Sequence, residues 1–198
     1  KIANVDGILI IDKPAGITSH DVVYKVRRIL KTKRVGHTGT LDPFATGVMV
    51  VLVGQATRLA RFLDKDEKAY EAVMRFGFET DTGDLDGLRT ADRGLRIEEI
   101  DQILQSAEWN QIFVGFRGEI NQTPPMYSAK KVDGKKLYEL ARKGETTERK
   151  PVSVTISRLE LIESAIRDRR SAIDTLRISV ACSAGTYIRT LAEDIGRK

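Results

Sequence analysis

Apolar and polar residues along the chain follow two periods, one typical of helices and one typical of strands. The apolar positions within 22–30 recur at helical spacing. Thr18 and Asp21, just before them, have the spacing of a capping box, so the pattern predicts a helix of about three turns. Residues 68–78 instead alternate between apolar and polar side chains, which is typical of a half-buried strand.

The remaining elements follow from shorter stretches of the same two patterns. We expect buried strands at 7–11 and 48–53, and further strands at 113–120, 152–162 and 172–181. We expect helices at 56–63, 97–107 and 137–142, and a final helix that opens at Gly185 and Thr186. Residues 79–94 are rich in Asp and Gly and predict an exposed acidic loop, and turns are expected at 132–134 and 167–170.

The order of these elements bears on the fold class. Helices and strands mix without a regular β-α-β alternation, which favours an α+β fold with a mixed, mostly antiparallel central sheet flanked by helices. A length of 198 residues suits one domain of ordinary size with a core of its own.

Composition excludes several classes of protein. The chain is 41% hydrophobic and 31% charged and lacks an apolar run of about 18 residues, so it is neither disordered nor membrane-spanning. The single cysteine, Cys182, excludes an intramolecular disulfide framework and fits a reducing compartment. His20 and His37 are the only histidines, too few for a His/Cys zinc site. No signal peptide is visible, and we expect a cytoplasmic protein.

The net charge of +5 conceals an uneven distribution. Residues 1–63 carry ten basic and four acidic side chains, residues 64–101 carry six and twelve, and residues 102–198 carry seventeen and twelve. Basic clusters occupy 22–34 and 130–150, the second with tyrosines nearby. Such clusters are typical of proteins that bind a polyanion such as RNA. They are equally typical of a solvated helix face, and charge alone leaves both interpretations open.

Three short motifs suggest chemistry. Asp42 precedes Pro43 in the Gly/Thr-rich stretch 35–47; a carboxylate on such a loop can be a nucleophile, although Asp-Pro is also a common turn former. The sequence 36–39 fits the GxxG of an RNA-binding loop, a weak signal by itself. The sequence 19–21 contains the residue types of a hydrolase triad, but consecutive residues cannot form one, and we interpret it as a helix start.

Two further residues have an ordinary and a functional interpretation. Tyr70 lies on the apolar face of a predicted strand, where most tyrosines belong to the core. Arg189 lies in the first turns of the final helix, where the helix dipole favours anions, yet an exposed arginine there is unexceptional. The residue pattern alone does not decide between these interpretations.

Longer motifs carry a resemblance to a known family. They are GILIIDKP at 7–14, SHDVV at 19–23, GHTGTLDP at 36–43, KAYEA at 68–72, TDTGDLDG at 80–87, PPMYSAKKVDGKKLYELARKG at 124–144 and CSAGTYIRTLAEDIG at 182–196. In this order, they resemble the TruB family of tRNA pseudouridine synthases over nearly the whole chain. The resemblance implies the pseudouridine synthase fold.

The resemblance also implies a reaction. The expected activity converts the T-loop uridine of tRNA (position 55) to pseudouridine, with no cofactor and no metal, in a cytoplasmic protein that acts as a monomer. The partner is tRNA, and the basic segment at about 121–150 matches an insertion that grips its T arm. We expect the acidic residues within 81–86 to face away from the tRNA.

The resemblance implies three catalytic residues. Asp42 matches the required aspartate, Tyr70 matches a tyrosine that packs on the target base and can handle its C5 proton, and Arg189 matches the arginine that pairs with the aspartate. The carboxylate can add to C6 of the uracil, attack C1′ of the ribose or deprotonate C2′, and the sequence leaves these routes open.

Other positions match the substrate pocket. His37 matches a loop histidine near the flipped-out nucleotide, and Tyr187 and Lys13 match positions that line or support the pocket. A Lys-Pro turn such as the one at 13–14 can equally be structural.

The chain departs from the family's pattern in one respect, and two alternative functions stay open. The chain ends at Lys198, and we expect the C-terminal end of the catalytic domain and any PUA domain to be absent, which would remove one wall of the pocket. The first alternative is an RNA-guided synthase of the dyskerin type, although the long basic insertion argues against it. The second is a tRNA-binding or tRNA-folding module that is inactive in this short form.

Overall fold

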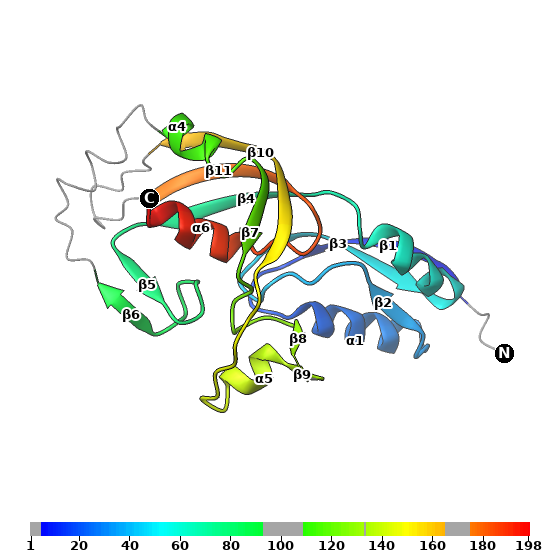
Figure 1. Cartoon of the computed structure of the whole chain (residues 1–198). Helices are drawn as coiled ribbons and strands as arrows, with labels where there is room; N and C mark the ends of the chain where they lie inside the picture. Colours follow the sequence, from blue (N-terminus) through cyan, green and yellow to red (C-terminus); the bar gives the residue numbers. More distant parts are fainter. Residues whose placement is uncertain (1–4, 93–108, 133, 165–174) are drawn as a thin grey trace, which may run out of the picture. The chain divides into compact units, whose positions relative to one another are not determined.

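The computed structural model describes residues 5–92, 109–132, 134–164 and 175–198 (Figure 1). The chain divides into two compact units, Lys1–Asp66 and Glu67–Lys198. Each unit has its own buried core and its own sheet.

The first unit is a three-stranded antiparallel sheet with a helix on one face. Its strands, in the order β1-β3-β2, are β1 (Gly7–Lys13), β3 (Gly47–Val53) and β2 (Val35–His37). Helix α1 (Ser19–Ile29) begins with the expected capping box between Thr18 and Asp21, and buries its valines against β2 and β3. The predicted helix at 56–63 is a 3-10 turn, η1 (Gly54–Leu59), followed by the short α2 (Ala60–Leu63).

Strand β1 is present as predicted, but the prediction that it is buried was wrong. Ile8, Ile10 and Val48 are 46%, 68% and 70% exposed. Alternation along a strand sends successive side chains to opposite faces, and only the face that carries Val51 packs on α1. Leu52, opposite Ile8 on the other face, is nevertheless fully buried, so that face is covered at some positions and open at others. An uninterrupted apolar run does not reveal which of its positions stay exposed.

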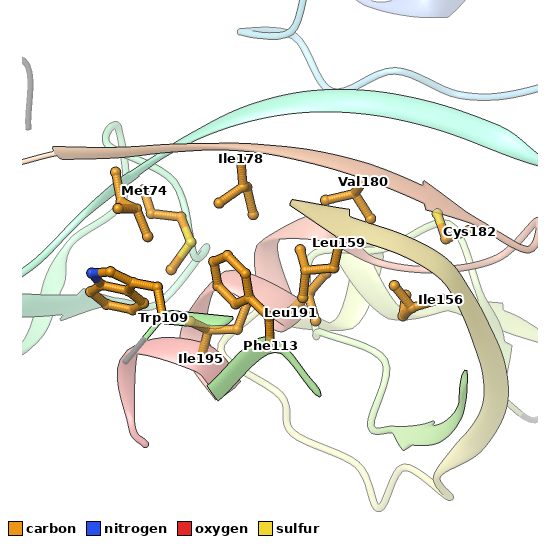
Figure 2. Packing of buried hydrophobic residues seen from close by; sticks show 11 residues of the cluster. Met74, Trp109, Phe113, Ile156, Leu159, Ile178, Val180, Cys182, Leu191 and Ile195 are labelled. Carbon is orange, nitrogen blue, oxygen red and sulfur yellow. The ribbon is translucent and has the colours of Figure 1, made fainter. Parts of the chain in front are cut away.

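The second unit is built on a four-stranded antiparallel sheet. Its strands, in the order β4-β11-β10-β7, are β4 (Lys68–Arg75), β11 (Thr175–Cys182), β10 (Val152–Ser164) and β7 (Gly118–Gln122). Helices α4 (Trp109–Val114) and α6 (Ile188–Gly196) pack on this sheet. Figure 2 shows Phe113 of α4 and Leu191 of α6 pointing toward Ile178 and Leu159 of the sheet; all four are fully buried.

Two small hairpins and a short helix complete the second unit. Strands β5 (Phe78–Thr80) and β6 (Arg89–Asp92) form the first hairpin. Strands β8 (Lys131–Val132) and β9 (Lys135–Lys136) form the second, at the predicted turn, and α5 (Leu137–Ala141) follows as predicted. The prediction of one exposed acidic loop over 79–94 was therefore wrong, because part of this segment pairs as strands.

The prediction of a strand over 113–120 was wrong in its first half. Residues 109–114 form α4, and pairing with β10 begins at Gly118. Trp109, Ile112, Phe113 and Phe116 all join the core from one side, and their spacing of three and four is helical. The final helix begins at Ile188, later than predicted. The predicted helix at 97–107, the turn at 167–170 and residues 172–174 lie outside the described residues.

The fold class is as predicted. The architecture is α+β, and every strand pairing among the described residues is antiparallel. The main strands form two sheets, one in each unit, where the sequence predicted one central sheet. Among the described residues, no helix is long and apolar enough to cross a membrane.

Candidate active site

The loop that carries Asp42 follows β2 in the first unit and is held by main-chain contacts. The hydroxyl of Ser19 donates to the carbonyl of Leu41 at 3.1 Å and accepts from the amide of the same residue at 2.9 Å. Ser19 is the first residue of α1 and is buried. The carbonyl of Asp42 accepts from the amide of Ala45 at 3.1 Å, which closes a turn. The main chain of Leu41, the residue before Asp42, is therefore held in place.

The residue after the carboxylate is fixed by Lys13. This lysine ends β1 and is 0% exposed. Its Nζ donates to the carbonyls of Pro14 at 2.9 Å, Ile17 at 2.7 Å and Pro43 at 3.2 Å. The amide of Gly16, a residue with φ of +83°, donates to the same Pro43 carbonyl at 2.8 Å. The three donors of an ammonium group are thus matched to three carbonyl acceptors.

The charge of Lys13 also bears on Asp42. Burial lowers the pKa of Lys13 from its usual value, and the negative charge of Asp42 counteracts part of that decrease. The lysine therefore both holds the main chain beside Asp42 and interacts with the charge of its carboxylate.

His37 ends β2, opposite Val51 in the sheet, and is half-buried. Its Nδ1 is a buried atom without a hydrogen-bond partner among the described residues. A ring nitrogen in this state can accept a hydrogen bond from a ligand or from water.

Arg189 lies in the first turn of α6 in the second unit and holds two other segments. Its guanidinium group donates to the carbonyl of Thr82, in the loop between β5 and β6, and to the carbonyl of Tyr127 at 2.9 Å. The hydroxyl of Tyr127 in turn lies 3.5 Å from a carboxylate oxygen of Asp81. The planar fork of an arginine suits such a bridge between two acceptors.

Tyr187 is the N-cap residue of α6. Its amide donates to Oε1 of Gln122 at 2.9 Å, and its carbonyl accepts from Nε2 of the same side chain at 3.1 Å. Tyr70 lies on β4 opposite Val180 and packs against the core of the second unit while remaining half-buried.

Several polar groups of the acidic loop at 80–87 form hydrogen bonds within the loop itself. The hydroxyl of Thr82 donates to a carboxylate oxygen of Asp84 at 2.8 Å, and Asp81 accepts from the amide of Leu88 at 2.8 Å. A Cβ at Gly87 would lie 2.1 Å from the Thr82 hydroxyl oxygen, so only glycine fits there. The loop is a folded structure and presents its Thr82 carbonyl to Arg189.

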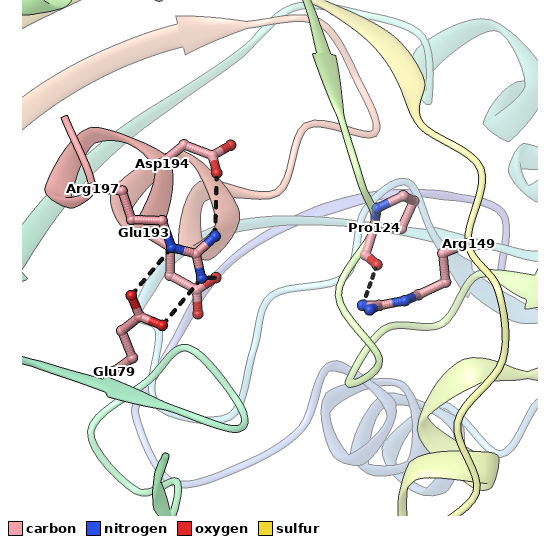
Figure 3. Close-up of polar contacts among 6 residues, drawn as sticks. All are labelled: Glu79, Pro124, Arg149, Glu193, Asp194 and Arg197. Carbon is pink, nitrogen blue, oxygen red and sulfur yellow. Dashed lines mark hydrogen bonds and ion pairs between the residues drawn. The ribbon is translucent and has the colours of Figure 1, made fainter. Parts of the chain in front are cut away.

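At the other end of α6, charges gather around Arg197. Its guanidinium group makes two contacts of 3.2 Å with Glu79 of β5 and lies 3.8 Å from Glu193 and 4.0 Å from Asp194 (Figure 3). Burial raises the pKa of Glu193 and of Asp194, and Arg197 counteracts part of each increase.

A basic cleft of about 330 Å³ lies within the segment 121–150 and its continuation. Its lining combines one acidic residue, Glu148, with four basic residues and four apolar residues. The basic residues are Lys130, Lys131, Arg149 and Lys150, and the apolar residues are Pro124, Val132, Leu137 and Val152. The guanidinium group of Arg149 is anchored by the Pro124 carbonyl at 3.1 Å (Figure 3).

A half-buried tyrosine stands in the same basic segment. The Tyr138 ring has Lys136 and Arg142 each 5.3 Å from its centroid. Positive charge beside an aromatic face is an arrangement that RNA-binding surfaces use.

The structure brings the predicted residues together within each unit. In the first unit, Lys13 at the end of β1 contacts the loop that carries Asp42, and His37 at the end of β2 precedes that loop. Tyr187 and Arg189 share the start of α6 in the second unit. Asp42 and Arg189 belong to different units, and their pairing stays a prediction.

Two supporting residues, Ser19 and Gln122, are not among the site residues that the sequence predicts. The sequence indicates that Ser19 begins a helix, but it does not indicate the bonds of Ser19 to Leu41. The predicted strand ends at 120 and does not include Gln122. Its spacing of two from the half-buried Ile120 could have indicated a buried polar residue on the core face.

Comparison with known proteins identifies the family of this chain. Residues 27–188 match the family described as TruB family pseudouridylate synthase (N terminal domain). The chain belongs to this family. No group of three or more His, Cys, Asp or Glu side chains gathers as a metal site would require within the described ranges.

Curated relatives in the family carry one name, tRNA pseudouridine synthase B. The chain is 46% identical to the protein of Endomicrobium trichonymphae over 194 residues and covers 98% of itself and 78% of that protein. It is 47% identical to the protein of Geobacillus thermodenitrificans and 48% identical to that of Pseudomonas putida strain GB-1, covering 62% and 59% of their lengths. The chain thus spans about three fifths to four fifths of these relatives.

Solved structures agree with the fold. The chain is similar to one in "Crystal Structure of a Cbf5-Nop10-Gar1 Complex", with a TM-score of 0.63 and 28% identity over 96% of this chain and 44% of that one. It is also similar to one in "Structure of H/ACA RNP bound to a substrate RNA containing 2'-deoxyuridine", with a TM-score of 0.61 and 26% identity over 96% of this chain and 42% of that one.

Proposed function

We propose that this chain isomerises the T-loop uridine of tRNA, at position 55, to pseudouridine, with Asp42 as the catalytic carboxylate. The observation that carries the proposal is the main chain around Asp42. Ser19 holds the residue before it and Lys13 holds the residue after it, in a chain 46–48% identical to proteins named tRNA pseudouridine synthase B. A loop whose main chain is held on both sides of a carboxylate suits covalent or base catalysis, which requires a well-positioned group.

The reaction needs no external reagent. The C1′–N1 bond breaks, the freed uracil turns and a C1′–C5 bond forms, while the C5 proton leaves and N1 gains one. The isomerisation is redox-neutral, which is why we assign no cofactor and no metal. Asp42 would act by addition to C6, attack on C1′ or removal of a proton from C2′.

The other site residues would support this carboxylate. Arg189 would pair with Asp42 and keep it ionised against the desolvation of a closed pocket. Tyr70 would pack on the uracil and would handle its C5 proton. Tyr187 would line the pocket, and His37 would lie near the flipped-out nucleotide.

Substrate binding would rest on the basic segment 121–150. The target base is stacked inside the T loop, so flipping it out costs a few kcal/mol. Phosphate contacts in the basic cleft and stacking near Tyr138 would offset that cost. We infer a cytoplasmic enzyme that acts on the T arm as a monomer, with the acidic loop at 81–86 facing away from the RNA.

The test is pseudouridine mapping on a T-arm RNA hairpin after incubation with wild type, Asp42→Asn and Asp42→Ala. We expect product with wild type only, with a rate loss of at least about a thousandfold in both variants. T-arm affinity should be retained, because the carboxylate contributes to chemistry and not to phosphate binding. Equal product from wild type and Asp42→Ala contradicts the proposal.

A second measurement tests the basic cleft. Lys130→Ala, Lys131→Ala and Lys150→Ala should each weaken T-arm binding and reduce the slope of log affinity against log salt by about one for each phosphate that the variant no longer neutralises. The matched control is Lys65→Ala, an exposed lysine of the first unit, which should leave the salt slope unchanged. An unaltered slope in all three cleft variants would place the RNA elsewhere.

The RNA-guided alternative is favoured by one observation, the similarity to chains in the H/ACA RNP and Cbf5-Nop10-Gar1 structures. Their identities of 26% and 28% are well below the 46–48% shared with the tRNA pseudouridine synthase B proteins. The mapping assay separates the two functions, because a guided enzyme modifies nothing without added guide RNA. Tight, salt-sensitive binding without product from wild type would instead favour the tRNA-binding module.

A further inference from the structure

The fully buried Gln122 has a position that neither the family assignment nor the proposed chemistry explains. It is the last residue of β7 and is 0% exposed. A buried polar side chain costs free energy unless it is hydrogen-bonded. The oxygen and the nitrogen of its amide each hydrogen-bond to the main chain of one residue, the N-cap Tyr187. The side chain thus pairs with a main-chain segment as a neighbouring strand residue would.

This contact determines where α6 begins. Tyr187 has extended main-chain angles, φ −99° and ψ 105°, and no side chain caps the helix. Its carbonyl already accepts the first helical bond, from the amide of Leu191 at 3.0 Å, so the Nε2 of Gln122 provides a second donor to the same oxygen. The turn from extended chain into helix is therefore fixed from outside the helix.

The same segment also braces Arg189. Tyr127 lies five residues after Gln122, and its carbonyl accepts from the Arg189 guanidinium group at 2.9 Å. The stretch 122–127 thus contacts α6 at two points, one at the N-cap main chain and one at the arginine side chain. It is also where the basic segment 121–150 starts.

We propose that Gln122 is a positioning residue for the isomerisation, which clamps the start of α6 so that Tyr187 and Arg189 are presented to the reacting nucleotide. The inference rests on the proposed function. The amide does not touch the substrate; it acts through the main chain of Tyr187. Because a misplacement of about 1 Å can cost roughly a hundredfold in rate, loss of the clamp should lower the rate of chemistry and leave T-arm affinity intact.

Three substitutions separate the clamp from simple packing. Gln122→Met keeps the length and volume but removes both hydrogen bonds, and we expect a single-turnover rate lower by roughly 30-fold with T-arm Kd within about twofold of wild type. Gln122→Glu keeps the acceptor for the Tyr187 amide but turns a carboxylate oxygen toward the Tyr187 carbonyl. It should be as slow as Gln122→Met at pH 8. The matched control, Val154→Ala, removes a buried side chain from the same sheet face on the adjacent strand and should retain the wild-type rate.

The pH profile of Gln122→Glu provides the decisive readout. A buried carboxyl has a raised pKa, and its protonated form can donate to the Tyr187 carbonyl as the amide does. The rate of Gln122→Glu relative to wild type should therefore recover as pH falls from about 8 to about 5, whereas Gln122→Met should show no such recovery. A purely volumetric role predicts a flat ratio for both variants, and that result would overturn the inference.

An activity-independent measurement distinguishes failure of the clamp from failure of the proposed function. Hydrogen exchange of the Tyr187 amide should be faster in Gln122→Met than in wild type. Pseudouridine from wild type together with wild-type rates in the Gln122 variants overturns the clamp alone. No product from wild type overturns the proposed function and the catalytic role of the clamp with it, while amide exchange still reports whether Gln122 holds Tyr187.

Discussion

The loop around Asp42 and the start of α6 are both fixed at the main chain, but by different kinds of group. Lys13 and Ser19 hold the loop from positions 30 and 22 residues away from their partners. The start of α6 is held by Gln122 across 65 residues, and Arg189 reaches carbonyls 62 and 107 residues away. The first region is held by a buried ammonium group and a hydroxyl, and the second by a neutral amide and by a guanidinium group that reaches distant carbonyls.

This difference has consequences for stability and assembly. The main-chain contacts described around the Asp42 loop lie within the first unit, so that loop can form once β1, α1 and β3 are in place. The start of α6 requires β7, the loop between β5 and β6, and the segment after β7, and closing such long loops costs more chain entropy. We therefore expect the carboxylate loop to be sensitive to loss of a buried charge, and the arginine to be sensitive to distant structure.

Among the substitutions that test this comparison, Arg189→Lys is expected to lower the rate of pseudouridine formation the most. A lysine ammonium is a point charge on a flexible stem and cannot bridge two carbonyls as the planar guanidinium group does. The single-turnover rate of pseudouridine formation should fall roughly 100-fold, while far-UV circular dichroism stays that of wild type. Arg197→Lys changes the same residue type at the other end of α6, where it pairs with Glu79, and should leave the rate unaltered. A wild-type rate in Arg189→Lys would show that its two carbonyl contacts do not matter.

A smaller effect on rate and a clear effect on stability are expected from Lys13→Met. The substitution leaves the carbonyls of Pro14 and Ile17 without their buried donor, and the free energy of unfolding should fall by about 2 kcal/mol. The rate should fall roughly tenfold because the chain beside Asp42 loosens. Urea unfolding and single-turnover kinetics measure the two quantities. The control Val26→Ala, a core substitution on α1, should lose stability and keep its rate.

The same variant has a pH signature. The pKa of Lys13 in the folded chain lies below 10.5, so between the folded and unfolded values the unfolded chain holds more protons than the folded chain. Stability contributed by this group therefore rises with pH as the pH approaches 10.5. Wild type should show this rise relative to Lys13→Met, and parallel pH curves for the two proteins would contradict the burial of a titrating lysine.

The smallest effect is expected from Glu193→Gln, one helical turn after Arg189 on α6. Burial raises the pKa of Glu193 above 4.5, so the folded chain holds this proton over a range in which the unfolded chain has released it. Its contribution to stability is present below pH 4.5 and is lost as pH rises through the folded pKa. The glutamine variant should match wild type near pH 4 and be more stable at pH 7, by less than about 1 kcal/mol. Glu160→Gln, at an exposed position of β10, should show no such difference between the two pH values.

Much of the local structure was predictable from residue patterns. The capping box and apolar spacing gave α1, and alternation gave β4 and β10. The strand predicted at 113–120 failed because Phe113 belongs to a helical set that begins at Trp109. A short apolar run does not distinguish a helix from a strand until one knows which neighbours it packs against.

For the candidate site too, some features follow from the sequence and others only from the tertiary structure. The sequence by itself determined the family, because the motifs that contain Asp42, Tyr70 and Arg189 are long and specific. The catalytic roles of these three residues stay predictions. Only the tertiary structure decided how the main chain beside them is held, since Lys13 and Gln122 act on carbonyls and amides that every residue possesses. A hydrogen bond to a main-chain group has no side-chain partner type to recognise in a sequence, and the fold alone brings its two ends together.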